Sequence, residues 1–367
     1  MRWEQAYEEL RTFAAGDSEI RLTPHVTIIP EQIRPRFYQL FDIARTAFIR
    51  EHLPDASEET KQLKDLYFDV EGRVKGMLDL EEVAIPSEVS RFLNETEGRL
   101  SEALFDRLFE LLRDQMDVET FEKQTSIALR GLYAELFQQA YRNWVVLSLI
   151  ESLGGRAHFS VNAPLIEMTA RGPKRATDPQ SIPKPQATRQ LSFLSETFPA
   201  FIVPNFIVDS AGIGGFVAFK TEIGDVYGQI QVMWRAADAN PEREWFSHEE
   251  LEPLWKRYHT LDLKRDVLFY VCDRLSDLAL VADSERFARP DGVVVCVSRK
   301  DEAEKLHEKG RLYKDHLRPR SGVFMILPDP SKEISVSPSE GIHWLPVGFE
   351  QSMLLPILHS LKRHQTS

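Results

Sequence analysis

Residues 200–235 read AFIVPNFIVDSAGIGGFVAFKTEIGDVYGQIQVMWR, and this stretch decides the fold of the second half of the chain. Branched and aromatic residues between short turns predict three β-strands in it, FIVPNFIVD, GFVAFKTE and YGQIQVMWR. The turn SAGIGG leads into a strand and lacks the helix N-terminus that phosphate-binding loops use. It therefore predicts a hairpin turn with a positive φ angle at glycine.

Apolar runs alternate with helical patterns on either side of this stretch. Leu191 to Phe198 predicts a short helix, and further helices are predicted at 247–260, 299–316 and 349–362. Strands are predicted at RDVLFYVCD, LALVAD, GVVVCVS, GVFMILPD and IHWLPVG. Continuous apolar strands alternating with helices favour a buried, partly parallel sheet.

In the first part of the chain, apolar residues recur at the spacing of a helix. Leucine and aromatic residues recur at a spacing of three to four through 38–155, which predicts about five helices. Gly154 and Gly155 end the last of them, as expected for a left-handed C-terminal cap. The sequence thus predicts an α+β or α/β two-domain protein, with an N-terminal all-α domain followed by a mixed-sheet α/β domain. The expected boundaries are 1–155 (acidic helical domain), 156–190 (basic, proline-rich linker) and 191–367 (α/β domain with a central three-strand meander).

The charge is uneven along the 367 residues, whose net charge is −12. Residues 1–155 hold 18 Lys and Arg against 29 Asp and Glu, a net charge of −11. This balance excludes a basic protein that coats DNA, although the second half could still contact nucleic acid. No apolar run approaches the roughly 20 residues that span a bilayer, and MRWEQAYEEL lacks the apolar core of a secretion signal. Cys272 and Cys296 lie in strand-like runs and are expected to be buried in a cytoplasmic protein.

Two basic segments could contact phosphates. The linker carries Arg171, Lys174, Arg175, Lys184 and Arg189, and the helix at 299–316 with its exit carries Lys309, Arg311, Lys314, Arg318 and Arg320. A solvated hinge and the preference of cations for helix C-termini are the alternative explanations. The sequence contains no GK[ST] loop, GxGxxG between strand and helix, HExxH, CxxC or GxSxG.

Charged side chains also occur among the three strands. Lys220 and Glu222 share one strand face because successive side chains alternate, and Asp209 could lie opposite them across the turn. Together they could form a set of reactive side chains. A cross-strand ion pair without catalytic function has the same pattern.

The predicted order of a helix, three strands, a helix and a strand over 187–300 resembles the core of the PD-(D/E)xK nuclease superfamily. Pro204 and Asn205 stand near the place of the first motif, and Asp209 follows them. Ala218 occupies the position of the second acid, so Glu222 would have to replace it. The resemblance implies a Mg²⁺-dependent phosphodiesterase in which Asp209 and Glu222 bind the metal and Lys220 orients or activates the attacking water. Glu196, on the preceding helix, could be a further ligand. The missing acid implies an altered or inactive site.

The leading functional hypothesis is therefore a nucleic-acid-associated protein with a nuclease-like core, of the restriction or anti-phage defence type. Two alternatives remain open. One is a non-catalytic assembly subunit that binds a protein partner through the helical domain at 38–155. The other is a sensor that binds a small ligand at strand ends in the C-terminal layers, near Asp273, Asp283 or Ser298.

Overall fold

The computed structural model describes most of the chain. The described residues are 2–161, 166–169, 172–175, 185–194, 204–222, 224–226, 229–231, 245–246, 248–275, 287–297, 303–329 and 340–363. The contacts divide the chain into two compact units, Met1–Asp65 with Ser87–Ala140, and Leu66–Pro86 with Tyr141–Ser367. We call them the helical unit and the α/β unit. They confirm the predicted fold class, a helical part followed by a mixed sheet.

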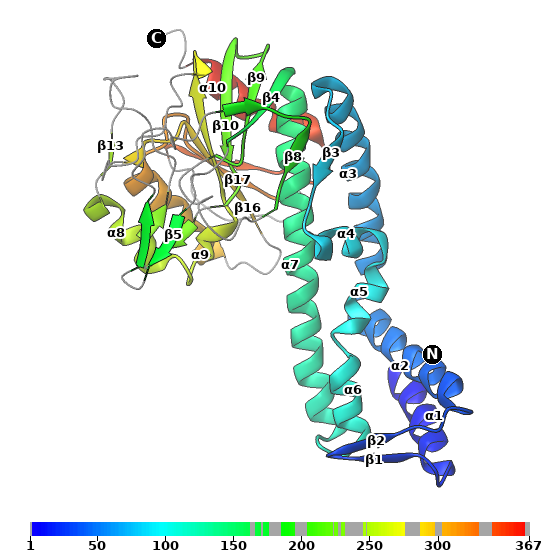
Figure 1. The fold of residues 1–367 in the computed structure, drawn as a ribbon. Coiled ribbons are helices and arrows are strands. Elements are labelled where there is room, and N and C mark those ends of the chain that lie inside the picture. The colour runs from blue at the N-terminus through cyan, green and yellow to red at the C-terminus, as the bar shows by residue number, and fades with distance from the viewer. Residues whose placement is uncertain are drawn as a thin grey trace. The chain divides into compact units, whose positions relative to one another are not determined.

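The helical unit consists of helices and one small hairpin (Figure 1). Its elements are α1 (Trp3–Gly16), β1 (Arg21–Thr23), β2 (Val26–Ile28), α2 (Arg34–His52), the first part of α3 (Ala56–Leu78), α4 (Ser87–Asn94), α5 (Thr96–Glu102), α6 (Phe105–Leu112) and the first part of α7 (Val118–Ser152). The unit holds 15 Lys and Arg against 23 Asp and Glu, a net charge of −8. Most of the acidity of the chain therefore belongs to this unit.

Helix α1 and the β1–β2 hairpin were not among the predicted elements. Trp3, Ala6, Tyr7 and Leu10 are buried at a spacing of three to four, so one apolar stripe faces the unit's interior. The region 22–37 contains the hairpin and the start of α2. Pro35 lies in the first turn of α2, where its missing N–H is harmless.

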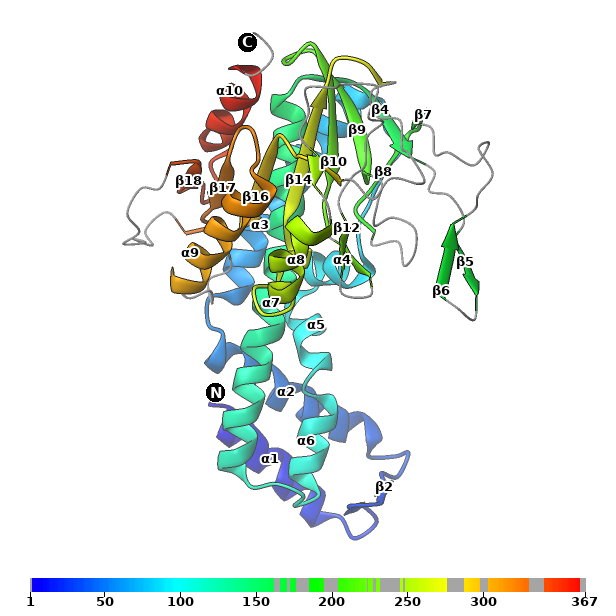
Figure 2. The same ribbon diagram turned by 90° about the vertical axis from the view of Figure 1, so that its left-hand side faces the viewer.

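A mixed sheet forms the centre of the α/β unit (Figure 2). Within the described residues it has eight strands in the order β18-β17-β16-β14-β10-β9-β4-β7. Their bounds are β4 (Gly155–Val161), β7 (Pro185–Ala187), β9 (Phe206–Ser210), β10 (Gly215–Lys220), β14 (Val267–Cys272), β16 (Gly292–Cys296), β17 (Val323–Ile326) and β18 (Ile342–Leu345). β16, β17 and β18 are parallel, and the other pairings are antiparallel.

The predicted hairpin is confirmed. β9 and β10 pair antiparallel, with Phe216 opposite Asp209, and Gly214 in the turn has a φ angle of 78°. The expected three-strand meander is wrong in its third strand. β12 (Gln229–Gln231) pairs with β11 (Gly224–Val226) outside the main sheet, and β14 occupies the other edge of β10. A central strand is buried on both faces, and the polar sequence QIQ suits that place less well than the apolar VLFYVC.

Two further expectations differ from the structure. Residues predicted to start a helix at 191–198 form β8 (Gln190–Ser192), which pairs parallel with β3 (Glu82–Ala84). Leu191 and Phe193 are buried alternately with more exposed neighbours, as in a strand. The segment expected to be a linker, 156–190, contributes β4 and β7 to the main sheet. Gly155 is closely packed at the start of β4, because a Cβ atom there would lie 2.7 Å from Leu78 Cδ2 and would displace that side chain.

Helices cover one face of the sheet. α8 (His248–Arg257) and α9 (Ala303–Leu312) contribute Leu251, Leu254 and Leu306 to a core with the strand residues Ala218, Leu268 and Val293 (Figure 2). Cys272 and Cys296 are buried with free thiols, as predicted. No helix among the described residues is long and apolar enough to cross a membrane.

A buried histidine makes the sheet sensitive to acid. His158 on β4 is 3% exposed, and burial lowers its pKa to about 4 from the ordinary 6.5, although its Nδ1 lies 3.4 Å from the Thr188 carbonyl. Between pH 6.5 and pH 4 the unfolded chain is protonated at this residue and the folded chain is not, so acid favours unfolding.

We expect the free energy of unfolding to fall as pH drops through this window, with up to about 3 kcal/mol of the fall due to His158. Chemical denaturation of wild type and His158→Gln at several pH values measures this contribution as their difference. His359→Gln, at an exposed position, is the matched control. Equal pH dependence in wild type and His158→Gln would refute the prediction.

Candidate functional site

Asp209 belongs to an ion pair at the surface of the sheet. Arg156 on the neighbouring strand β4 donates to Asp209 Oδ1 from Nε at 3.2 Å and also from Nη2. The side chain of Asp209 is 22% exposed. The carboxylate therefore already has a cation partner within the sheet.

The hairpin register separates Asp209 from Lys220. Asp209 lies opposite Phe216, and Lys220 is four residues further along β10, roughly 13 Å away at the rise of a strand. Lys220 is 2% exposed and pairs in the backbone register with Leu268 of β14. Glu222 follows two residues later, beyond the end of β10. The structure thus places the two predicted metal ligands at opposite ends of the hairpin.

Ala218 has a packing explanation. It is fully buried between Ile207 and Tyr270 on the neighbouring strands, in the core beneath α8 and α9. A carboxylate there would be desolvated inside an apolar cluster. Within the described residues, no group of three or more His, Cys, Asp and Glu side chains is arranged to hold a metal ion. Mg²⁺ at Asp209 and Glu222 remains a prediction from the sequence.

The predicted phosphate contacts have different environments. Arg189 pairs with Asp79 at 3.1 Å and Glu81 at 2.7 Å. Arg311 is exposed and Lys314 is half-buried. Lys174 and Arg175 lie on β6 (Gly172–Arg175), which pairs with β5 (Ile166–Thr169). Arg171, Lys184, Glu196, Asp283 and Ser298 lie outside the described residues.

Lys309 belongs to a buried polar cluster that the sequence reasoning missed. Lys309 Nζ lies 2.7 Å from Asp266 Oδ2, and the Tyr313 hydroxyl donates to the same oxygen at 2.6 Å. Lys309 also donates to the carbonyl of Asp262 at 3.0 Å. All three side chains of the cluster are at least nine-tenths buried. The sequence contains a signal for the burial of Lys309, because this residue shares a helix face with Leu306, Tyr313 and Leu317 at a spacing of three to four.

Burial dominates the electrostatics of this cluster. It raises the pKa of Asp266 to about 6, even though Lys309 and the hydrogen bond from Tyr313 oppose the shift. Burial likewise raises the pKa of the Tyr313 hydroxyl well above its usual range and that of the Cys296 thiol to about 12. The phenol is thus a neutral hydrogen-bond donor and the thiol is unreactive. The cluster fixes α9 to the start of β14 and exposes no group for chemistry.

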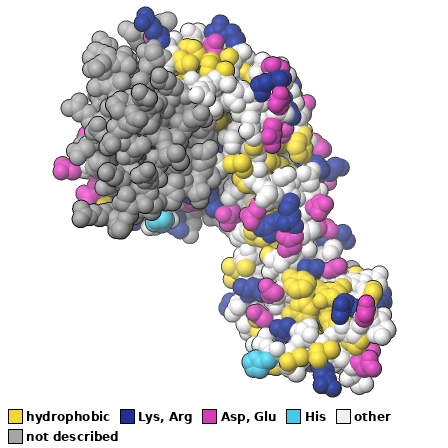
Figure 3. Space-filling view, in the orientation of Figure 1, with side chains coloured by type: hydrophobic (Ala, Val, Ile, Leu, Met, Phe, Trp, Pro, Cys, Tyr) yellow, Lys and Arg dark blue, Asp and Glu magenta, His cyan; other side chains and the backbone are white. Residues whose placement is uncertain are grey.

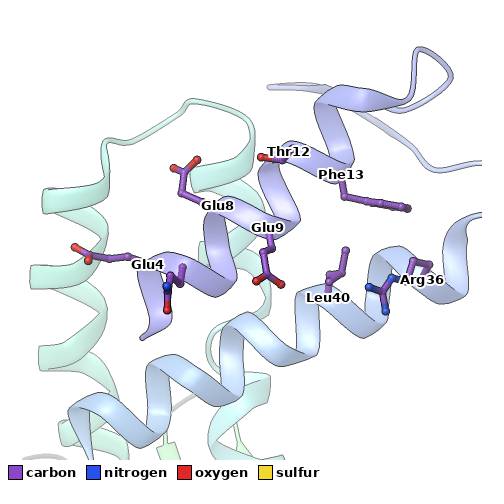
Figure 4. A pocket seen from close by; sticks show the side chains of 8 residues that line it. Glu4, Glu8, Glu9, Thr12, Phe13, Arg36 and Leu40 are labelled. Atoms are coloured by element: carbon purple, nitrogen blue, oxygen red, sulfur yellow. The ribbon is translucent and has the colours of Figure 1, made fainter. Parts of the chain in front are cut away.

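Two surface grooves lie on the helical unit. The first, of about 720 Å³, lies between α1 and α2 (Figure 4). Its lining residues are Glu4, Gln5, Glu8, Glu9, Thr12, Phe13, Arg36 and Leu40. The second, of about 540 Å³, is bounded by the β1–β2 hairpin, α2 and α6, and its lining includes Pro24, Thr27, Tyr38, Phe105, Phe109 and Arg113. We call them the α1–α2 groove and the aromatic groove.

Comparison with known proteins returned no relative. No protein-family model, no curated protein and no solved structure matches this chain. The functional conclusion therefore rests on the sequence and the structure.

We expect the effects of substituting Asp266 and Lys309 on the free energy of unfolding to be strongly non-additive. Asp266→Asn and Lys309→Met should each destabilise the protein by about 3–5 kcal/mol, because each leaves its partner buried without a counter-charge. The double variant should lose much less than the sum of the two losses. Denaturant unfolding of all four proteins gives the coupling energy.

The exposed pair Glu252–Lys256, at 2.9 Å on α8, is the matched control. Glu252→Gln and Lys256→Met should couple by less than about 1 kcal/mol, because exposed pairs are screened by solvent. Additive losses at Asp266 and Lys309 would contradict the structural role given to their ion pair.

Proposed function

We propose that this chain is a non-catalytic assembly subunit whose helical unit binds a protein partner. The main support is the exposed apolar surface at the β1–β2 hairpin and the aromatic groove beside it. Figure 3 shows hydrophobic side chains on this unit among Lys, Arg, Asp and Glu.

The hairpin carries apolar side chains on an uncovered face. Val26 and Ile28 point to the same side of β2 and are 44% and 46% exposed. Thr27 points to the other side, where its hydroxyl accepts a hydrogen bond from Arg113. A two-stranded hairpin is marginally stable by itself, and this one leaves its apolar face in water. Binding of a partner would cover that face.

The aromatic groove combines aromatic side chains and Arg113 with the polar residues Asp106, Glu110 and Gln115. The rings of Tyr38 and Phe105 stack at 6.5 Å with an interplanar angle of 10°, and Phe105 meets Phe109 edge-on at 5.2 Å. Phe105 is 37% exposed. Aromatic side chains and arginine are enriched in protein interfaces. The net charge of −8 on this unit repels phosphate backbones, so a protein partner is favoured over nucleic acid.

A photo-crosslinking amino acid at Ile28 tests the proposal in the source cells. We expect one discrete adduct, containing the same protein in each preparation, because the partner covers this face. Val26→Asp in the same chain should abolish the adduct, and the β-branched Val26→Thr should retain it. The photo-crosslinking amino acid placed instead at the exposed Lys123 should give no such adduct. An adduct unaffected by Val26→Asp, or no adduct at Ile28, would overturn the proposal.

The nuclease hypothesis is tested separately. We expect purified protein to leave plasmid DNA and single-stranded RNA intact with Mg²⁺ or Mn²⁺, because Arg156 engages Asp209 and the hairpin separates Asp209 from Lys220. Asp209→Ala should behave as wild type. Metal-dependent cleavage that EDTA and Asp209→Ala both abolish would instead make this protein an enzyme.

A further inference from the structure

The α1–α2 groove has an apolar floor. Phe13, half-buried, continues the apolar stripe of α1, and Leu40 of α2 is 4% exposed. In Figure 4, Leu40 extends from α2 toward α1, and Phe13 lies on the side of α1 nearer α2. Ile43, one turn beyond Leu40 on the same face of α2, is 37% exposed and extends the apolar surface.

Carboxylates line one wall of this groove. Glu4 and Glu8 are one helical turn apart on α1. Glu9 points from α1 toward α2, whereas Glu8 points away from α2 (Figure 4). All three are exposed. Arg36 on α2 is the single Lys or Arg among the groove's lining residues. The wall formed by α1 is therefore negative, and the floor is apolar.

These carboxylates are weakly engaged within the chain. Glu4 lies 3.1 Å from Arg2, whose side chain is 70% exposed, and Glu8 lies 3.6 Å from Arg11, whose side chain is 55% exposed. Exposed pairs of this kind contribute at most about 1 kcal/mol. Glu9 makes no ion pair with another described residue. A ligand could therefore form ion pairs with these carboxylates, and the loss of their present ion pairs would cost little free energy.

We propose that the α1–α2 groove binds a basic amphipathic helix of the partner protein. Apolar side chains of that helix would contact Phe13, Leu40 and Ile43, and Lys or Arg residues spaced one turn apart would pair with Glu4, Glu8 and Glu9. The proposal rests on the proposed function, since it names a second surface of the same unit and the chemistry that this surface recognises.

The negative charge of the groove favours a basic helix over nucleic acid, anionic lipid or a second copy of this unit. Phosphates of nucleic acid and anionic lipid headgroups would be repelled by the three carboxylates. A second copy of this helical unit has the same net charge of −8 and would be repelled as well. An amphipathic helix in a groove is a common mode of recognition, with anchors at a spacing of three and four residues.

A synthetic peptide provides the test. The probe is a fluorescein-labelled helix of about 14 residues, roughly four turns, with Leu at a spacing of three and four and Lys on the flanking positions. Fluorescence anisotropy with the full-length protein measures its Kd. One comparison peptide has Glu in place of every Lys, and another has the same composition in an order without an apolar face. Both comparison peptides should bind at least about ten-fold more weakly, since each loses either the ion pairs or the apolar anchors.

Matched protein variants assign the binding to the groove. Glu4→Gln, Glu8→Gln and Glu9→Gln together should weaken binding of the basic peptide by about ten-fold, and added salt should reduce this difference. A control variant changes the same number of charges at exposed positions outside the groove lining, Glu58→Gln, Glu95→Gln and Glu119→Gln. It should bind like wild type. Circular dichroism shows whether each variant is folded.

Three outcomes would overturn the inference. They are no binding of the basic peptide, equal weakening by the groove and control variants, and equal binding of the peptide without an apolar face. If crosslinking at Ile28 still identifies a partner, the proposed function survives and only the groove assignment fails. If the peptide binds as expected and crosslinking at Ile28 finds no partner, the proposed function fails, and the groove is left as a binding site for basic amphipathic helices.

Discussion

The burial of β14 on both faces is the constraint on which the α/β unit depends. All six residues of Val267–Cys272 are buried, so the strand needs a neighbour on each edge and a layer on each face. β10 and β16 supply the edges. Gly292 of β16 lies against the ring of Phe269, which a Cβ atom at this position would displace. Asp266, directly before the strand, binds Lys309 and Tyr313 and thereby fixes the helical layer in place.

Much of this architecture could be predicted from local sequence patterns. The β9–β10 hairpin, the strands β14, β16 and β17, and the helices of the helical unit other than α1 follow from periodicity and turn residues. Strand pairing could not be predicted, because the neighbour of a strand need not be close in the sequence. β10 pairs with β14 across more than forty positions of the chain, and β8 pairs with β3 across an even longer separation. A central place in the sheet is buried on both faces, so the more apolar of the available strands occupies it and thereby sets the pairing.

The site residues illustrate the same limit. Asp209, Lys220 and Glu222 were grouped because side chains alternate along a strand, which gives the face but not the distance along the hairpin. The register puts Asp209 near the turn and Lys220 at the far end. The basic segment around Lys309 predicts a surface cation, whereas its helix face places it among buried residues. Charge composition identified the acidic unit, and side-chain geometry was needed to locate grooves on it.

The interleaving of the two units along the chain has a consequence for synthesis on the ribosome. The helical unit is complete once residue 140 has emerged, and local helical contacts form quickly. Residues 66–86 belong to the α/β unit, and their strand β3 waits for β8 at Gln190–Ser192. During that interval part of an early segment has no partner, and its apolar residues Val83 and Ala84, buried in the finished fold, remain open to chaperones. The synthesis of residues 87–189 therefore separates the two strands of this pair in time.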